Sequence, residues 1–246
     1  MNGILGFTGL LKRPDLSDEK KIEFIHIIEQ SGERLLGLIN DIINISKIEA
    51  GQQQVHLSTI NINHQVLFVF DSLRLDAKSK GLALACTYGL SYEEAIIRSD
   101  KEKLFGILTN LVKNAIKYTD RGKIEFGYIK KDDMIEFYVK DTGIGIAEDK
   151  QNDIFERFIQ ADISNKMARH GVGLGLSIAK AYVEMLGGSI RVNSKLGEGS
   201  TFYFTLPYKS ETYDQLPEDI GDLTIPDRSD LRIVIAEDDD ISHQHL

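Results

Sequence analysis

The first part of the chain carries the apolar pattern of helices. Ile4, Phe7 and Leu11 form a short apolar face that stops near Pro14, and Ser17 suits the start of a new helix. Residues 18–50 then repeat apolar side chains at heptad-like spacings, which is typical of a long helix with a packing seam. The seam consists of Ile25, Ile28, Leu35, Ile39 and Ile42. The pattern predicts a helical hairpin over residues 1–55, with a seam that needs partner helices to cover it.

Residues 56–208 mix helical and strand patterns. The capping-box pair Ser99 and Glu102 indicates where one of the helices begins. Helices are predicted over 63–80 and 100–118, and strands over 82–87, 123–130, 134–140, 189–194 and 200–206. Helices combined with mostly antiparallel strands predict an α/β sandwich. The fold class is therefore α+β, with a helical hairpin followed by a sandwich domain.

A candidate ligand-binding acid stands at the end of one predicted strand. Residues 134–140 alternate between apolar and polar side chains, and the strand ends at Asp141. Gly143 and Gly145 follow within a few residues. A carboxylate at this place can accept a hydrogen bond from the exocyclic amine of a base, and glycines let the backbone approach a planar ring. A hairpin turn with an exposed Asp is the alternative interpretation.

A polar cluster lies on the helix predicted over 100–118. Asn110, Asn114 and Lys117 are spaced by four and three residues, so they share one helix face. The amide oxygen of Asn114 is a hard ligand that suits Mg2+, and Lys117 offers a point charge to phosphate oxygens. An ordinary exposed helix face has a similar composition. Together with Asp141, however, the cluster indicates a site for a metal-bound nucleotide.

A second glycine-rich loop precedes the apolar helical pattern that starts at Leu176. Gly171, Gly173 and Gly175 place backbone amides at the predicted start of this helix, where unpaired N–H groups favour anions. A Rossmann fingerprint is excluded, because its third glycine would fall on Leu176 if it began at Gly171 and on Ile178 if it began at Gly173. Residues 147–170 are polar and are interpreted as a lid. Its candidate cations are Arg157, Lys166, Arg169 and His170, of which Arg157 is the favoured candidate for reaching the terminal phosphate. Solvated lid charges are the alternative.

Five stretches resemble, in the same order, the motifs of the sensor histidine kinases. They are 110–119 (NLVKNAIKYT), 141–146 (DTGIGI), 154–158 (IFERF), 171–177 (GVGLGLS) and 197–202 (GEGSTF). The resemblance implies a Bergerat-type sandwich that binds ATP, with Asp141 on the adenine amine and Mg2+ on Asn114. The ATP-binding residues that it implies are Asn110, Asn114, Lys117, Tyr118, Asp141, Gly143, Gly145, Ile146, Phe158, Gly171, Gly173, Leu174, Gly175, Leu176 and Thr201. It also implies that the hairpin forms a homodimeric four-helix bundle.

The start of the chain departs from the family pattern. Residues 1–7 are similar to the stretch that follows the H box of the family, so the phospho-accepting histidine is expected about six residues upstream of Met1. His26 on the second helix is interpreted as an ordinary surface or bundle residue. No catalytic residue is therefore assigned, and this chain is expected not to phosphorylate itself.

The end of the chain resembles the start of another domain. Residues 209–230 are acidic and contain Pro217 and Pro226, which is typical of a linker. Residues 231–246 begin with an apolar strand pattern that leads to Glu237 and Asp238, similar to the Mg2+-binding acids of a response-regulator receiver domain. A frayed acidic tail is the alternative. The resemblance implies a hybrid kinase that passes its phosphoryl group to a receiver aspartate.

Composition narrows the function classes. The 246 residues have a net charge of −9, which argues against nucleic-acid binding through a basic surface. No apolar run reaches the roughly 20 residues of a membrane span, so a cytoplasmic protein, or the cytoplasmic part of a membrane-anchored sensor, is expected. Two alternatives to a kinase core remain open, which are a hydrolytic ATPase of the same superfold and a non-catalytic nucleotide-binding dimerisation module.

Overall fold

The computed structural model of the protein describes residues 2–13, 16–157, 159 and 173–208. The predicted linker at 209–230 and the receiver-like segment at 231–246, with Glu237 and Asp238, lie outside the described residues. The same is true of Phe158, Gly171 and three of the candidate lid cations, Lys166, Arg169 and His170.

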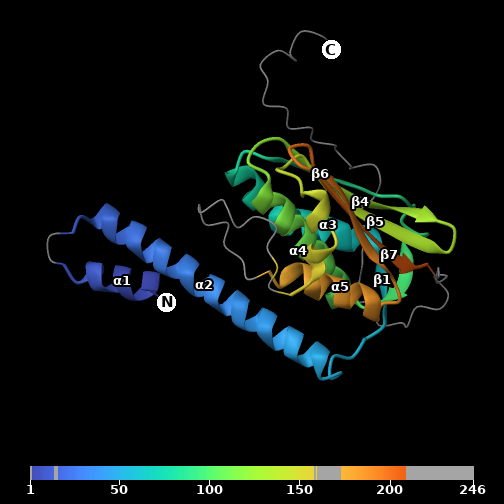
Figure 1. Ribbon diagram of the computed structural model, residues 1–246, viewed down its shortest axis with the longest axis horizontal. Coiled ribbons are helices and arrows are strands. Elements are labelled where there is room, and N and C mark those ends of the chain that lie inside the picture. Colours follow the sequence, from blue (N-terminus) through green and yellow to red (C-terminus); the bar gives the residue numbers. More distant parts are fainter. Residues whose placement is uncertain (1, 14–15, 158, 160–172, 209–246) are drawn as a thin grey trace, which may run out of the picture. The chain divides into compact units, whose positions relative to one another are not determined.

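The N-terminal part is a helical hairpin, as predicted from its apolar pattern. Helix α1 (Asn2–Leu11) runs back along α2 (Asp18–Glu49), and the rings of Phe7 and Phe24 lie 5.1 Å apart between the two helices (Figure 1). The Ser17 side chain accepts a hydrogen bond from the Lys20 N–H and so caps α2. Several large apolar side chains of α2 stay exposed, namely Ile22, Ile25, Leu35, Leu36, Ile39, Ile42 and Ile43.

A mixed sheet forms the second part of the fold. Its strands are β2 (Ala83–Thr87), β4 (Lys123–Lys131), β5 (Met134–Asp141), β6 (Ile190–Lys195) and β7 (Gly199–Pro207). They lie in the order β2-β4-β5-β7-β6, in which the β2–β4 pair is parallel and the others are antiparallel. A two-stranded sheet of β1 (Ser58–Asn61) and β3 (Ile96–Ser99) was not predicted from the sequence.

Three helices cover one face of the larger sheet (Figure 1). They are α3 (Ile62–Ser79), α4 (Lys101–Tyr118) and α5 (Gly175–Met185). The sheet turns large apolar side chains toward them, and the rings of Phe137 and Phe204 stack at 4.5 Å in this core. Burying such aromatic side chains contributes about 1.5–3 kcal/mol each. The α/β sandwich predicted from the sequence is confirmed.

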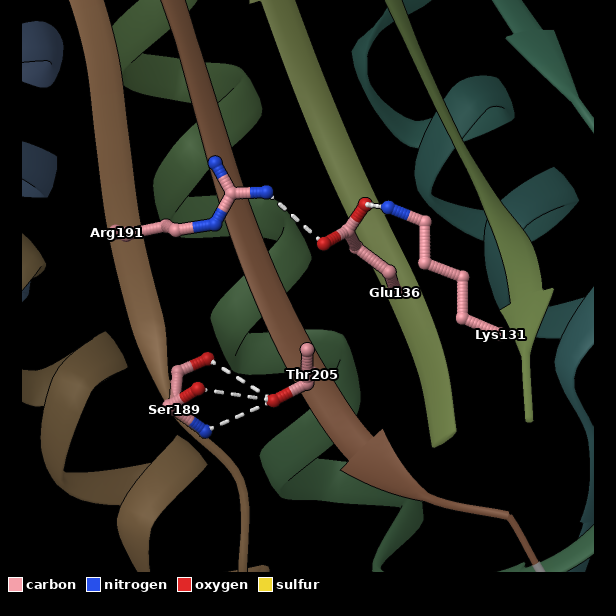
Figure 2. A network of polar contacts seen from close by, with 5 residues as sticks. All are labelled: Lys131, Glu136, Ser189, Arg191 and Thr205. Atoms are coloured by element: carbon pink, nitrogen blue, oxygen red, sulfur yellow. Dashed lines mark hydrogen bonds and ion pairs between the residues drawn. The ribbon is translucent and has the colours of Figure 1, made fainter. Parts of the chain in front are cut away.

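The other face of the sheet is polar. Glu136 on β5 accepts hydrogen bonds from Lys131 at 2.5 Å and from Arg191 at 2.9 Å. Figure 2 shows Lys131 reaching it from the adjacent strand β4, and Arg191 reaching it from β6 across β7. Burial alone would raise the pKa of Glu136, but these two cations hold it below its usual value. Arg191 also lies over the Tyr203 ring at 4.0 Å. The two faces of each strand thus have opposite characters, and only the helix-covered face carries the core.

The start of α4 differs by one residue from the sequence prediction. Asp100, not Ser99, is the N-cap, because Ser99 still pairs with Ser58 in the small sheet. The Asp100 Oδ1 accepts a hydrogen bond from the Lys103 N–H at 3.0 Å. Strand pairing therefore overrides the capping-box pattern at this position.

Across the described ranges, every helix is too short or too polar to cross a membrane.

Candidate functional site

The Asp141 carboxylate is buried at the end of the central strand β5. Asp141 is 6% exposed, and in the sheet it lies between Ile124 on β4 and Ser200 on β7. Its Oδ1 accepts hydrogen bonds from the Gly143 N–H at 2.8 Å and from the Ser200 N–H at 3.3 Å. Within the described part of the chain both of these hydrogen bonds reach Oδ1. Oδ2 is therefore the oxygen that can accept a hydrogen bond from a ligand.

Burial raises the pKa of Asp141, and the two backbone N–H groups oppose that rise. A carboxylate in this environment is poorly solvated, so it gains more from a hydrogen-bond donor of a ligand than a surface Asp would gain. The arrangement suits an exocyclic amine presented by a planar base.

The loop after Asp141 is held by backbone hydrogen bonds on two sides. The Ile144 N–H donates to the Tyr118 carbonyl at the end of α4, at 3.2 Å. The Ile144 carbonyl accepts from the Gly197 N–H at 2.7 Å, in the turn between β6 and β7. The Ile146 N–H donates to Ser194 Oγ at 2.8 Å. These bonds fix the loop between the end of α4 and the β6–β7 turn.

Gly145 is required by the close approach of this loop to the β6–β7 turn. Its φ is +68°, and a Cβ atom built on it would lie 2.0 Å from the Lys195 carbonyl oxygen. A side chain at this position would therefore be strained and would also collide with the backbone.

The polar edge of α4 meets the start of α5. Asn110, Asn114, Lys117 and Tyr118 are all partly exposed, whereas the intervening apolar side chains of α4 face the core. The Asn110 Oδ1 lies 3.4 Å from the position that a Cβ of Gly175 would occupy. The Lys117 Nζ lies 4.7 Å from the centre of the Tyr118 ring. The predicted cluster on α4 and the second glycine loop are thus brought together.

The start of α5 presents backbone N–H groups that lie before its first intrahelical hydrogen bond. The first intrahelical bond runs from the Ile178 N–H to the Leu174 carbonyl, at 3.0 Å. Leu174 makes no side-chain capping bond, and the amides of Gly175, Leu176 and Ser177 precede the hydrogen-bonded ladder. Gly173, at φ +77°, leads the chain into this helix. A helix start with uncapped amides is a favourable place for phosphate oxygens.

The segment between the two loops is anchored by an aromatic residue. It includes the short 3-10 helices η1 (Glu148–Lys150) and η2 (Asp153–Phe155). Phe155 is buried and packs edge-on against Phe202, with ring centres 6.3 Å apart. Arg157, the candidate lid cation, forms an ion pair with Glu49 at the end of α2. Its described contact is therefore with the hairpin and not with Asp141 or the glycine loops.

Thr201 lies on the other face of the sheet from Asp141. Alternation along β7 turns Ser200, Phe202 and Phe204 toward the helices and Thr201 toward the polar face. Ser200, which is directly opposite Asp141, is the β7 residue beside the site, and its Oγ lies 2.9 Å from Ser194 Oγ. Sequence reasoning missed Ser200 and Ser194, although the parity of the strand residues could have identified Ser200.

Substitution of Gly145 by Ala should disrupt the loop, whereas the same change at Gly197 should be tolerated better. Both glycines have a positive φ, but a Cβ on Gly197 would meet nothing within 4 Å. Backbone strain alone costs on the order of 1–2 kcal/mol, and the collision at Gly145 adds to it. Thermal unfolding and nucleotide titration of both variants measure the difference. Equal effects of the two substitutions would contradict the close approach at Gly145.

Family models match two parts of the chain. The His Kinase A (phospho-acceptor) domain matches residues 1–51, and the histidine kinase-, DNA gyrase B- and HSP90-like ATPase matches residues 99–210. Together they cover the hairpin and most of the sandwich, including Asp141 and both glycine loops.

Individual relatives agree with the family models. The chain is 39% identical to hybrid signal transduction histidine kinase B of Dictyostelium discoideum over 84% of its own length, and 35% identical to the autoinducer 2 sensor kinase/phosphatase LuxQ of Vibrio cholerae over 97%. It spans 11% and 28% of the lengths of these two proteins. It is also similar to full-length ShkA crystallised with AMPPNP, with a TM-score of 0.68 and 31% identity over 86% of this chain and 43% of ShkA. Hairpin, sandwich, motif order and relatives agree, and the chain belongs to the sensor histidine kinases.

Proposed function

We propose that this chain is the ATP-binding core of a hybrid sensor histidine kinase, with Asp141 as the residue that recognises adenine. The observation that carries the proposal is the buried carboxylate whose Oδ1 is held by two backbone N–H groups. The adenine amine donates to Oδ2, and the glycines beside it let the ring lie against the backbone. The crystallised complex of the similar protein ShkA with AMPPNP, a nucleotide, supports nucleotide binding by this chain.

Phosphate binding falls to the start of α5 and to the polar edge of α4. The N–H groups at the start of α5 donate hydrogen bonds to the phosphate oxygens, and Lys117 on the polar edge of α4 adds a positive charge. Asn110 lies against Gly175, where α4 and the phosphate loop meet. Gly143, Gly145, Ile146 and Tyr118 shape the adenine end, and Gly173, Leu174, Gly175 and Leu176 shape the phosphate end.

Mg2+ fits this site through Asn114. The described residues include no group of three His, Cys, Asp or Glu side chains that could hold a metal by themselves. A nucleotide-bound Mg2+ needs few protein ligands, since phosphates and water supply most of its oxygens. Asn114, partly exposed on α4 one turn from Asn110, provides a neutral oxygen for it. When bound, the ion would neutralise the charge that develops on the phosphates.

Transfer to histidine is favoured over hydrolysis. The related ATPases have a glutamate that activates water at the position of Asn110, and an amide is a poor general base. The protein therefore holds the terminal phosphate for an acceptor side chain. The name of the Dictyostelium relative, a hybrid kinase, and the receiver-like residues 231–246 support onward transfer to a receiver aspartate in the longer protein.

The hairpin is proposed to form a homodimer. Exposed apolar side chains recur along α2, including Ile25 at 46%, Ile39 at 44% and Ile42 at 52% exposure. A strip of this kind along a helix is covered when hairpins pair into a four-helix bundle. The match to the His Kinase A domain supports this arrangement.

Asp141→Asn should weaken binding of Mg-ATP by about 10- to 100-fold, because a hydrogen bond to a charged group contributes about 1.5–3 kcal/mol. The ionised carboxylate is the acceptor, so affinity should also fall as the pH drops through the raised pKa of Asp141, at a higher pH than for a surface Asp. Titration calorimetry across a pH series measures both effects. Asp133→Asn, at an exposed residue of the β4–β5 turn, is the control. Equal affinities of wild type and Asp141→Asn would remove Asp141 from adenine recognition.

The 246-residue chain should bind ATP without phosphorylating itself. Residues 1–17 contain no histidine, and transfer depends on an acceptor held in line with the terminal phosphate. Incubation with γ-labelled ATP should leave it unlabelled, whereas a chain extended upstream through an H box should acquire an acid-labile, base-stable phosphate. Label on His26 would contradict the proposed acceptor. An extended chain that binds ATP and stays unlabelled would favour a non-catalytic module.

Ile39→Asp should shift the chain from dimer toward monomer, because a charge placed in an apolar helix seam loses its hydration. Sedimentation at micromolar concentrations measures the change. Lys47→Asp, at an exposed polar position of the same helix, is the control. A chain that is monomeric at all concentrations, with or without Ile39→Asp, would count against the bundle.

A further inference from the structure

A buried ion pair stands at the start of α4, apart from the candidate nucleotide site. Asp100 and Lys103 are 2% and 3% exposed, and the Lys103 Nζ lies 2.8 Å from the Asp100 Oδ2. Removing two charges from water costs several kcal/mol per ion, which the attraction repays only when further hydrogen bonds complete the geometry. Asp100 caps the helix by accepting a hydrogen bond from the Lys103 backbone N–H through its Oδ1. Capping therefore does not explain why the Lys103 ammonium is buried beside it.

The remaining hydrogen bonds of the pair go to the segment that joins the hairpin to the sandwich. The Asp100 Oδ2 accepts from the His56 N–H at 2.9 Å, and the Lys103 Nζ donates to the Gln54 carbonyl at 2.5 Å. Gln54 and His56 lie between the end of α2 and the start of β1. Both charged groups thus hold the backbone of this connecting segment.

The pair also adjoins the helix that begins with the phosphate-binding loop. The Lys103 Nζ lies 5.8 Å from the centre of the Tyr182 ring on α5. Gly106, one turn along α4, leaves room for that ring, because a Cβ at this position would approach it to 3.2 Å. The connecting segment, α4 and α5 therefore meet at Lys103.

Burial alone would raise the pKa of Asp100, but hydrogen bonds from the Lys103 side chain and from the Lys103 and His56 N–H groups hold it below its usual value. The carboxylate therefore stays ionised at neutral pH, and the contacts to the connecting segment persist.

We propose that Asp100 and Lys103 are positioning residues that fix the segment leaving the hairpin to α4, and so set the geometry between the hairpin and bound ATP. Neither residue belongs to the proposed ATP-binding set. The proposal rests on the proposed kinase function, because in-line transfer makes this geometry matter. A displacement of about 1 Å at a reacting centre can slow a reaction by about 100-fold.

The test uses the double variant Asp100→Asn/Lys103→Met. Asn is a good N-cap, and a neutral pair leaves no uncompensated buried charge. The control is Glu136→Gln/Lys131→Met, which neutralises the Glu136–Lys131 pair on the polar face of the sheet and touches no part of the connecting segment (Figure 2). It also removes the carboxylate partner of Arg191, whose side chain is 57% exposed and therefore stays hydrated. Titration with Mg-ATP should give wild-type affinity for both double variants.

Two measurements on the 246-residue chain show whether the connecting segment is fixed to α4. Hydrogen exchange of the His56 amide should accelerate by about tenfold or more in the Asp100/Lys103 variant and stay unchanged in the control. For the second measurement, spin labels are attached to cysteines that replace Lys47 and Asp133, after Cys86→Ser removes the natural cysteine. Labelled protein is diluted with unlabelled protein so that only distances within one chain are measured. The distance distribution should broaden in the Asp100/Lys103 variant and not in the control. A distance distribution that is unchanged in the Asp100/Lys103 variant would overturn the proposal. A roughly tenfold or greater loss of Mg-ATP affinity in this variant would also overturn it.

A third measurement separates the two proposals. In the longer protein with its acceptor histidine, the Asp100/Lys103 variant should label at least about tenfold more slowly, with an unchanged KM for ATP. Wild-type rates in this variant would overturn the positioning role. If the wild-type longer protein binds ATP and does not label, the kinase function fails, while the exchange and distance measurements still decide whether the pair fixes the segment.

Discussion

The candidate site depends on a carboxylate that the fold removes from water. Asp141 lies at the end of a strand with hydrogen-bonded neighbours on both sides, and two backbone N–H groups hold its Oδ1. Burial raises its pKa because the charged form loses hydration. A ligand donor that reaches Oδ2 replaces the hydrogen bonds to water that the carboxylate loses on burial. The loop glycines, the β6–β7 turn and the end of α4 all serve to hold the backbone around this one group.

Side chains alternate along each strand between the two faces of the sheet, and the two faces differ in character. One face packs Phe137 and Phe204 beneath α3, α4 and α5. At its edge the loop after β5 is hydrogen-bonded to the end of α4. The other face keeps its charges in compensated groups, such as Glu136 with Lys131 and Arg191. Paired charges on the polar face neutralise one another, whereas the carboxylate of Asp141 has no cation beside it among the described residues. That contrast explains why Asp141, and not Glu136, is suited to bind a ligand.

Much of the fold could be predicted from periodicity, because amphipathic helices and alternating strands leave a strong pattern in the sequence. The motif order pointed to Asp141, the α4 cluster and the glycine loops as the candidate site. Details that depend on tertiary contacts could not be predicted in the same way. Ser99 lies in the sequence pattern of a helix cap, yet it belongs to β3 and pairs with Ser58 of β1, so Asp100 caps the helix instead. The Asp100–Lys103 pair and its hold on Gln54 and His56 depend on side chains and backbone groups that lie far apart in the sequence.

The site near β7 illustrates the same limit. Thr201 was predicted from its motif, but strand parity turns it away from the helices, and Ser200 takes the place beside Asp141. The most direct measurement of the central claim is a crystal structure of the chain with Mg2+ and a non-hydrolysable ATP analogue. The adenine amine should donate to the Asp141 Oδ2, with the phosphates against the first amides of α5. Adenine bound elsewhere, with the Asp141 carboxylate contacting no ligand, would contradict the account.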